Sequence, residues 1–282
     1  MARRRVLDQI LKLDPQGDHA RIVHLTACYE FPFDFTRADE FALYRTYGVP
    51  SIANLLAGTG EFTERTQRRY DDTKLIISEL VEHGYDSERG QRAMRQMNHQ
   101  HGRFQIANAD FLYVLSTFVC EPPRWMARYG RRPMVEQEKL ALFYFWREVG
   151  LRMHLHSIPD GLAEFEQFNA DYELRNFQYS AAGHQVASAT RDMFLRWVLP
   201  PPLRRLGAPA IHALLDDHLL ESLGFPKPSP VLRGLVRQSL RARSRLTSWL
   251  PERRKPSLHT AKRHRSYPDG YQIERLGPPG KQ

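Results

Sequence analysis

The sequence is poor in cysteine and has no long apolar run, and each absence excludes a class of protein. Its two cysteines, Cys28 and Cys120, form neither a disulfide framework nor a CxxC pair, so a reducing compartment fits best. The longest apolar stretch, residues 111–120, falls well short of the roughly 20 residues that a membrane-spanning helix needs. The basic residues 3–5 are followed by an amphipathic stretch interrupted by charges, which is not the pattern of a signal peptide. We therefore expect a cytoplasmic protein, with at most a peripheral contact to a membrane.

Several catalytic signatures are also missing. The sequence has no HExxH motif, no glycine-rich phosphate loop, no GxSxG elbow and no zinc-type spacing of Cys and His. The sequence therefore contains no motif that indicates a hydrolase or a nucleotide-dependent enzyme. With 41% hydrophobic and 26% charged residues, the chain has the composition of an ordinary globular protein.

Helical periodicity dominates the sequence from residue 35 to 223, and no strand-like alternation of useful length interrupts it. We predict an all-α protein in which residues 1–226 form one helical domain. Residues 227–282 form a basic extension that packs on this domain or trails from it. Pro122-Pro123 is expected to end the most apolar helix, because proline lacks the N–H that a helix interior uses. The expected helices cover residues 61–83, 87–107, 110–120, 136–155, 160–177, 184–198 and 209–224.

The basic charge of the chain is concentrated near its C-terminus. Residues 227–265 contain twelve Lys or Arg and one acidic residue, Glu252, so this segment alone exceeds the net charge of +9 of the whole chain. Between residues 231 and 250 the arginines are interleaved with apolar residues, a pattern typical of a basic amphipathic helix. The segment is either a solvated tail or a surface for an anionic partner. Among such partners we favour a membrane surface, contacted through residues 229–265, over nucleic acid.

The segment Met97-Asn98-His99-Gln100-His101 holds the residue type best suited to bind a haem iron or another metal. At about 100° per residue, His101 shares a helix face with Met94, Met97 and Phe104 and therefore turns toward the core. His99 lies on the opposite face, which turns toward water. A histidine on such an apolar stripe is either a core residue with a hydrogen-bond partner or a ligand.

The expected helix over residues 61–83 places two polar side chains on its inner face. Arg69 and Thr73 lie on one stripe with Leu80. A buried arginine is costly unless it meets an anion. That anion is either an anionic group of a ligand or a buried carboxylate of the protein, for instance Glu138, Glu148 or Asp171. An inward arginine, threonine and histidine on adjacent helices together provide the parts of a haem pocket.

These residues belong to a set of short segments that resembles the MpaB family, which groups fungal oxygenases with bacterial latex-clearing proteins. The resemblance extends from about residue 41 to 276 and is closer to the fungal type. It implies a b-type haem in a globin-like helical core. His101 matches the axial histidine of that haem, and Arg69 and Thr73 match residues beside it. The segments that carry the resemblance are residues 47–53, 69–73, 97–101, 110–115, 129–132, 148–150, 158–159 and 267–271.

Two departures from the latex-clearing proteins bear on the reaction. Those proteins have a lysine just before the threonine that can serve as a second axial ligand, whereas this sequence has Asp72. They also have a glutamate upstream of the arginine that is implicated as a base. No carboxylate stands at the matching distance here, and the nearest are Glu61 and Glu64. We therefore expect no lysine-capped iron, and rubber itself is a poor candidate for the substrate.

The resulting hypothesis is a haem b-dependent oxygenase that uses O2 to cleave or oxygenate C=C bonds of an isoprenoid or another lipophilic substrate. His101 would hold the iron, Arg69 would anchor a haem propionate or polarise oxygen, and Thr73 would donate a hydrogen bond. Residues 111–118 and the aromatic residues 143–146 would line a channel for the substrate. Two alternatives stay open: a non-catalytic haem protein that binds or senses O2, and a haem-free helical lipid-binding protein. The sequence does not fix the oligomeric state.

Overall fold

The computed structural model describes residues 5–278, and within this range it consists of helices and connecting segments without a β-strand. The predicted all-α fold is confirmed. Short turns of other helical types occur at Thr26–Glu30, Pro201–Leu203 and Ile273–Arg275. The α-helices are α1 (Arg5–Ile10), α2 (His19–Leu25), α3 (Pro32–Thr46), α4 (Pro50–Gly58), α5 (Glu61–Glu64), α6 (Thr66–His83), α7 (Glu88–His101), α8 (Asn108–Tyr129), α9 (Glu136–Arg152), α10 (Leu162–Asn176), α11 (Ala181–Val198), α12 (Arg204–His212), α13 (Asp217–Ser222) and α14 (Pro230–Ser248).

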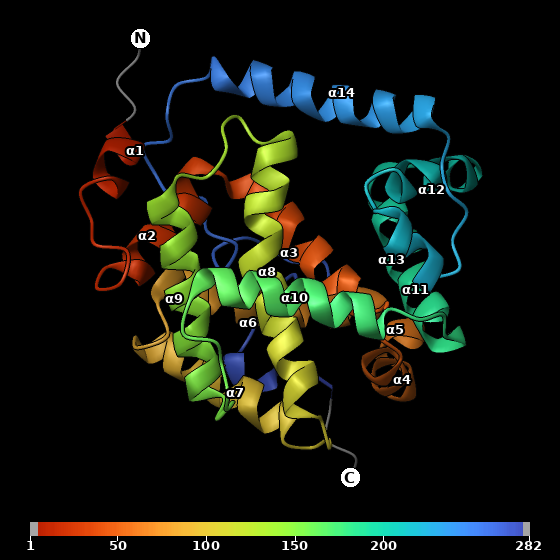
Figure 1. Ribbon diagram of the computed structural model, residues 1–282, viewed down its shortest axis with the longest axis horizontal. Helices are drawn as coiled ribbons and strands as arrows, with labels where there is room; N and C mark the ends of the chain where they lie inside the picture. The colour runs from red at the N-terminus through yellow and green to blue at the C-terminus, as the bar shows by residue number, and fades with distance from the viewer. Residues whose placement is uncertain (1–4, 279–282) are drawn as a thin grey trace.

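The long helix α8 runs through the middle of the molecule (Figure 1). It packs along α3 and also contacts α9 and α10. This central place follows from its sequence, because residues such as Leu112, Leu115 and Phe118 leave it no wide polar face and are all buried. In the same view α7 lies at the bottom of the molecule and α14 crosses the top.

Pro122 and Pro123 do not end α8, contrary to the expectation from the sequence. The helix continues to Tyr129 with both prolines inside it. Each proline removes one N–H donor, at a cost of about 3 kcal/mol where nothing compensates. Beyond them Trp125 and Met126 are buried, and the burial of each such side chain contributes about 1.5–3 kcal/mol or more. Packing against the core therefore outweighs the local preference of the two prolines.

Other helix boundaries also differ from the expected ones; for example, the helix expected over residues 136–155 ends at Arg152, and the one expected over 184–198 begins at Ala181. The helix expected over residues 61–83 is divided into α5 and α6, because Arg65 leaves helical geometry with φ −134° and ψ 40°. The helix expected over residues 209–224 is replaced by α12, which begins before Pro209, and by α13. The helix that carries the two histidines ends at His101, where Gly102 follows as the C-cap.

A buried cluster of charges connects α8 to its neighbours. Arg45 of α3 donates through Nε to Glu173 of α10 at 2.7 Å, and through Nη1 to Asp216, the N-cap of α13, at 2.5 Å. Tyr113 of α8 donates to the same carboxylate of Glu173 at 3.1 Å. Charge-assisted bonds of this kind are geometrically specific, so the cluster fixes the helices that surround α8.

The C-terminal extension has two parts with different surroundings. α14 is a surface helix that packs on α8 and α12. The chain then returns along α6 and α7, where Ile273 and Leu276 are buried. On α6, Glu82 accepts hydrogen bonds from the backbone N–H groups of His259 at 2.5 Å and Thr260 at 3.1 Å. The second part of the extension is thus packed into the folded body.

The turn between α6 and α7 brings two stretches of backbone into contact at Gly90. A Cβ atom at this position would lie 2.0 Å from the carbonyl oxygen of Gly84 and 2.7 Å from Cα of Tyr85. Ser87, the N-cap of α7, closes the turn by accepting the N–H of Gly90 at 3.0 Å. Because only glycine fits here, Gly90 sets how closely α7 approaches the end of α6.

Gly90→Ala is expected to destabilise the fold by at least about 2 kcal/mol, because the clash is with backbone atoms that cannot move aside. The matched control is Gly234→Ala in α14, where an added Cβ meets nothing within 4 Å and helix propensity predicts a gain of about 0.5–1 kcal/mol. Urea unfolding followed by circular dichroism measures both. Equal stabilities of the two variants would contradict the inference that the backbone at Gly90 packs too closely on Gly84 and Tyr85 to admit a side chain.

Candidate active site

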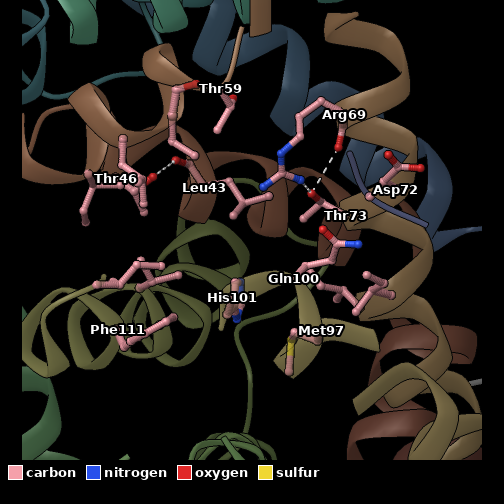
Figure 2. Close-up of a pocket in the computed structure, with 18 of the residues that line it drawn as sticks. Leu43, Thr46, Thr59, Arg69, Asp72, Thr73, Met97, Gln100, His101 and Phe111 are labelled. Atoms are coloured by element: carbon pink, nitrogen blue, oxygen red, sulfur yellow. Dashed lines mark hydrogen bonds between the residues drawn. The ribbon is translucent and has the colours of Figure 1, made fainter. Parts of the chain in front are cut away.

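A cavity of about 250 Å³ lies among α3, α4, α6, α7, α8, α9 and α11, and its walls are mostly apolar (Figure 2). Three of the aromatic residues expected to line a channel are on its wall: Phe111, Phe118 and Trp146. Phe143, Tyr144 and Phe145 do not line it, which corrects the expectation for these three residues; Phe143 and Phe145 pack inside the core instead. The remaining apolar lining comes from Leu43, Ile52, Leu55, Leu56, Phe62, Ile76, Ile77, Leu80, Met97, Phe104, Ile106, Val114, Leu115, Val149, Met153 and Met193.

His101, the last residue of α7, lines this cavity, whereas His99 is exposed on the other side of the helix. The helical phase predicts this difference. Nδ1 of His101 is buried and has no hydrogen-bond partner, and the ring makes an edge contact with Phe111 at a centroid distance of 5.2 Å. Burial, and to a lesser extent the charge of Arg69, lower the pKa of His101 to about 4. The imidazole is therefore neutral at pH 7, the form that can bind a metal.

Arg69 and Thr73 project into the cavity from α6, on the wall opposite His101 (Figure 2). Arg69 donates from Nη1 to the hydroxyl of Thr73, which itself donates to the backbone carbonyl of Arg69 at 3.1 Å. The guanidinium also lies over the ring of Phe62, at 5.4 Å from its centroid. Burial lowers the pKa of Arg69, and the charges of Tyr47, Asp72 and Glu61 oppose this only in part.

None of the carboxylates proposed as partners of Arg69 reaches it, so that part of the sequence interpretation is wrong. Across residues 5–278, Arg69 forms no ion pair at all. The three candidate acids are each paired with another arginine: Glu138 with Arg132, Glu148 with Arg152, and Asp171 with Arg175. The other alternative that the sequence left open is that Arg69 binds an anionic group of a ligand, and the structure is compatible with it.

Two carboxylates do line the cavity, and neither was singled out as a base from the sequence. Asp110, at the start of α8, accepts hydrogen bonds at Oδ1 from Ser51 at 3.1 Å and from the hydroxyl of Tyr172. Its place directly before the apolar run 111–120 was the available signal. Asp72 is the second carboxylate. Glu61 and Glu64, the nearest acids in sequence, do not line the cavity.

Asp72 is held by the C-terminal extension. Its Oδ1 accepts the hydroxyl of Tyr267, and the backbone N–H of Gly277 also bonds to it. Burial raises the pKa of Asp72, and these donors oppose the rise. Gly277 and Pro278 themselves lie on the cavity wall. The extension therefore closes one side of the cavity and keeps the carboxylate of Asp72 occupied.

Removal of the Tyr267 hydroxyl tests this closure. Tyr267→Phe is expected to lower the free energy of unfolding by about 1–3 kcal/mol, because the buried Asp72 loses one of its donors. Tyr179→Phe, at a tyrosine that is 63% exposed, is the control and should change it by less than about 0.5 kcal/mol. Denaturant unfolding measures both variants. A Tyr267→Phe protein as stable as the control would show that the extension does not depend on this bond.

Most of the chain matches a single protein family. Residues 42–247 match the family described as ER-bound oxygenase mpaB/B'/Rubber oxygenase, catalytic domain. The chain belongs to this family. It is 31% identical over 216 residues to the ER-bound oxygenase mpaB of Penicillium roqueforti (strain FM164). This match covers 70% of this chain and 72% of the relative. It is also 31% identical over 219 residues to the ER-bound oxygenase mpaB' of Penicillium brevicompactum, but this match covers 52% of that protein.

Family membership supports an oxygenase function and therefore an oxidoreductase. The matched range includes Arg69, Thr73 and His101, and it ends within α14. Of the helices between residues 5 and 278, none combines the length and the apolar character required to cross a bilayer.

Proposed function

We propose that the protein is a haem b-dependent oxygenase whose haem binds in the cavity between α6 and α7, with His101 as the axial ligand of the iron. One observation carries the proposal: a neutral imidazole without a hydrogen-bond partner faces an arginine without an ion-pair partner across a mostly apolar cavity. A haem requires a neutral nitrogen for its iron, a cation for its propionates and an apolar lining for its ring. The residues present fit all three requirements.

Each of the three residues has its own task in this proposal. His101 needs to lose no proton at pH 7 before it ligates the iron. Arg69 anchors a propionate or directs an N–H toward O2, and Thr73 keeps the guanidinium in place by accepting its hydrogen bond. When bound, ferrous haem supplies the capacity to activate O2, which these side chains lack.

The wall opposite His101 offers no second nitrogen ligand. Among the described residues that line the cavity, His101 is the only His or Lys. Asp72 occupies the position where the latex-clearing proteins have a lysine, and its carboxylate is engaged by Tyr267 and Gly277. We therefore propose that no protein side chain would compete with O2 for a haem bound in this cavity.

We propose a lipophilic substrate with C=C bonds, such as an isoprenoid chain. The apolar lining and its aromatic residues favour such a chain over a polar molecule. The family description includes the words rubber oxygenase, and rubber is a polyisoprenoid. In oxidative cleavage one C=C bond and the O–O bond break while two C=O bonds form, so one O2 supplies both oxygen atoms and no further reductant is consumed.

The axial ligand is tested by the colour of the purified protein. Wild type is expected to carry haem and a Soret band, and His101→Ala to lose most of the haem or shift the band, because the ring nitrogen at the iron is gone. His99→Ala, two residues away and exposed, is the matched control and should keep both. Full haem content and an unchanged spectrum in His101→Ala would refute the assignment.

The reaction is tested by mass spectrometry of products after aerobic incubation with prenylated quinones, terpenoids and polyisoprene. Shortened chains with new carbonyl groups are expected. Thr73→Val should retain haem but lower kcat by about 100-fold, since it frees the Arg69 side chain. Thr46→Val is the comparison, because the Thr46 hydroxyl donates to the Leu43 carbonyl within α3 at 2.6 Å, and a much smaller loss is expected. Reversible O2 binding without consumption of any substrate would favour the non-catalytic alternative.

A further inference from the structure

Of the thirteen large apolar side chains that are exposed within residues 5–278, eight lie on α14 or on segments next to it. Five of them belong to α14 and the two residues after it, among which Leu246 is 63% exposed and Trp249 is 84% exposed. Three more lie at the end of α11 and in the segment leading through α12, which packs on α14. A gathering of this size marks an interaction surface. The eight residues are Val198, Leu203, Leu206, Val231, Leu235, Leu246, Trp249 and Leu250.

α14 is attached to the body by its polar side chains as much as by its apolar ones. Arg233 pairs with Asp217 of α13, and Arg243 reaches Asp34 of α3 at 3.3 Å. Ser244, not an apolar residue, is the buried residue of this helix. An ordinary surface helix turns its apolar stripe inward, but much of the stripe of α14 points outward.

Three arginines of α14 remain beside this outward stripe without a carboxylate partner. Arg237, Arg241 and Arg245 are exposed and form no ion pair with any residue in the range 5–278. The helix itself contains no acidic residue. The exposed cations Arg253, Arg254 and Lys255 follow after Pro251 and Glu252, and the carboxylate of Glu252 accepts the backbone N–H of Arg5 at 2.9 Å.

We propose that α14 together with residues 249–255 binds the surface of an anionic lipid bilayer. The positive charge complements acidic headgroups, while Leu246, Trp249 and Leu250 enter the boundary between headgroups and acyl chains. Tryptophan suits that boundary because its ring is apolar and its N–H is polar. A second copy of the chain is a poorer fit, since a two-fold contact through α14 would bring the arginines of both copies together.

This surface is separate from the cavity. No residue of α14 lines the cavity, and α14 crosses the opposite end of the molecule from α7 (Figure 1). The proposal therefore holds whether or not the protein binds haem, and its test needs no enzymatic activity.

Vesicle sedimentation of the full chain tests the proposal. Binding is expected to phosphatidylcholine vesicles that contain about 30% phosphatidylserine, but not to phosphatidylcholine alone, and it should fall steeply by about 0.5 M NaCl. Arg245→Gln should weaken binding about fivefold, whereas Arg175→Gln on α10, whose side chain is 72% exposed, should not. Leu246→Ser should weaken it about tenfold, and Leu174→Ser, at a residue 75% exposed on α10, should not.

Tryptophan fluorescence provides a second readout on the same vesicles. A blue shift is expected on binding and should disappear in Trp249→Phe, because Trp125 and Trp146 are buried and the N–H of the half-buried Trp197 donates to Gln67 at 2.7 Å. No binding to the anionic vesicles would overturn the proposal, as would equal losses in the α14 and α10 variants. Dimerisation of the free protein that is lost in Leu246→Ser, without vesicle binding, would assign the surface to a second copy instead.

Discussion

The unpaired charge of Arg69 against an apolar cavity is the constraint on which the site depends. A guanidinium removed from water without an ion-pair partner costs several kcal/mol, and the contacts with Thr73 and the Phe62 ring and the attraction by Asp72 and Glu61 offset part of that cost. Folding tolerates such a cation where a bound anion later completes it. His101 presents the complementary feature on the opposite wall, a neutral donor atom that no protein group satisfies. We propose that both residues bind the same ligand, since a haem has a group for each of them.

Two other parts of the fold hold α6, which carries Arg69, and α7, which carries His101, in their relative positions. Gly90 allows α7 to start within contact of the end of α6, which fixes the histidine helix relative to the arginine helix. The C-terminal extension is held against α6 by hydrogen bonds to the acidic residues of that helix. Glu79 accepts a hydrogen bond from the hydroxyl of Tyr271, in addition to the bonds that Asp72 and Glu82 accept. The extension is therefore both the most basic part of the chain and a wall of its cavity.

Local periodicity was sufficient to predict the all-α fold and the direction of the important side chains. Helical phase separates His101 from His99 because residues two apart on a helix point to different faces. Phase gives no distance, however, so it could not tell that every candidate acid for Arg69 is already paired. The continuation of α8 through Pro122-Pro123 and the closure of the cavity by Gly277 depend on contacts between distant segments. Neither is encoded in a short window of sequence.

The central claim is that the ring nitrogen of His101 and no other group holds the iron. It is tested most directly by His101→Gly, in which the deleted imidazole leaves room for a free one. Haemin is titrated into the purified variant with and without added imidazole, and the Soret band is followed. The account predicts that imidazole restores stoichiometric binding and a band like that of wild type. Stoichiometric binding with the wild-type band before any imidazole is added would contradict it.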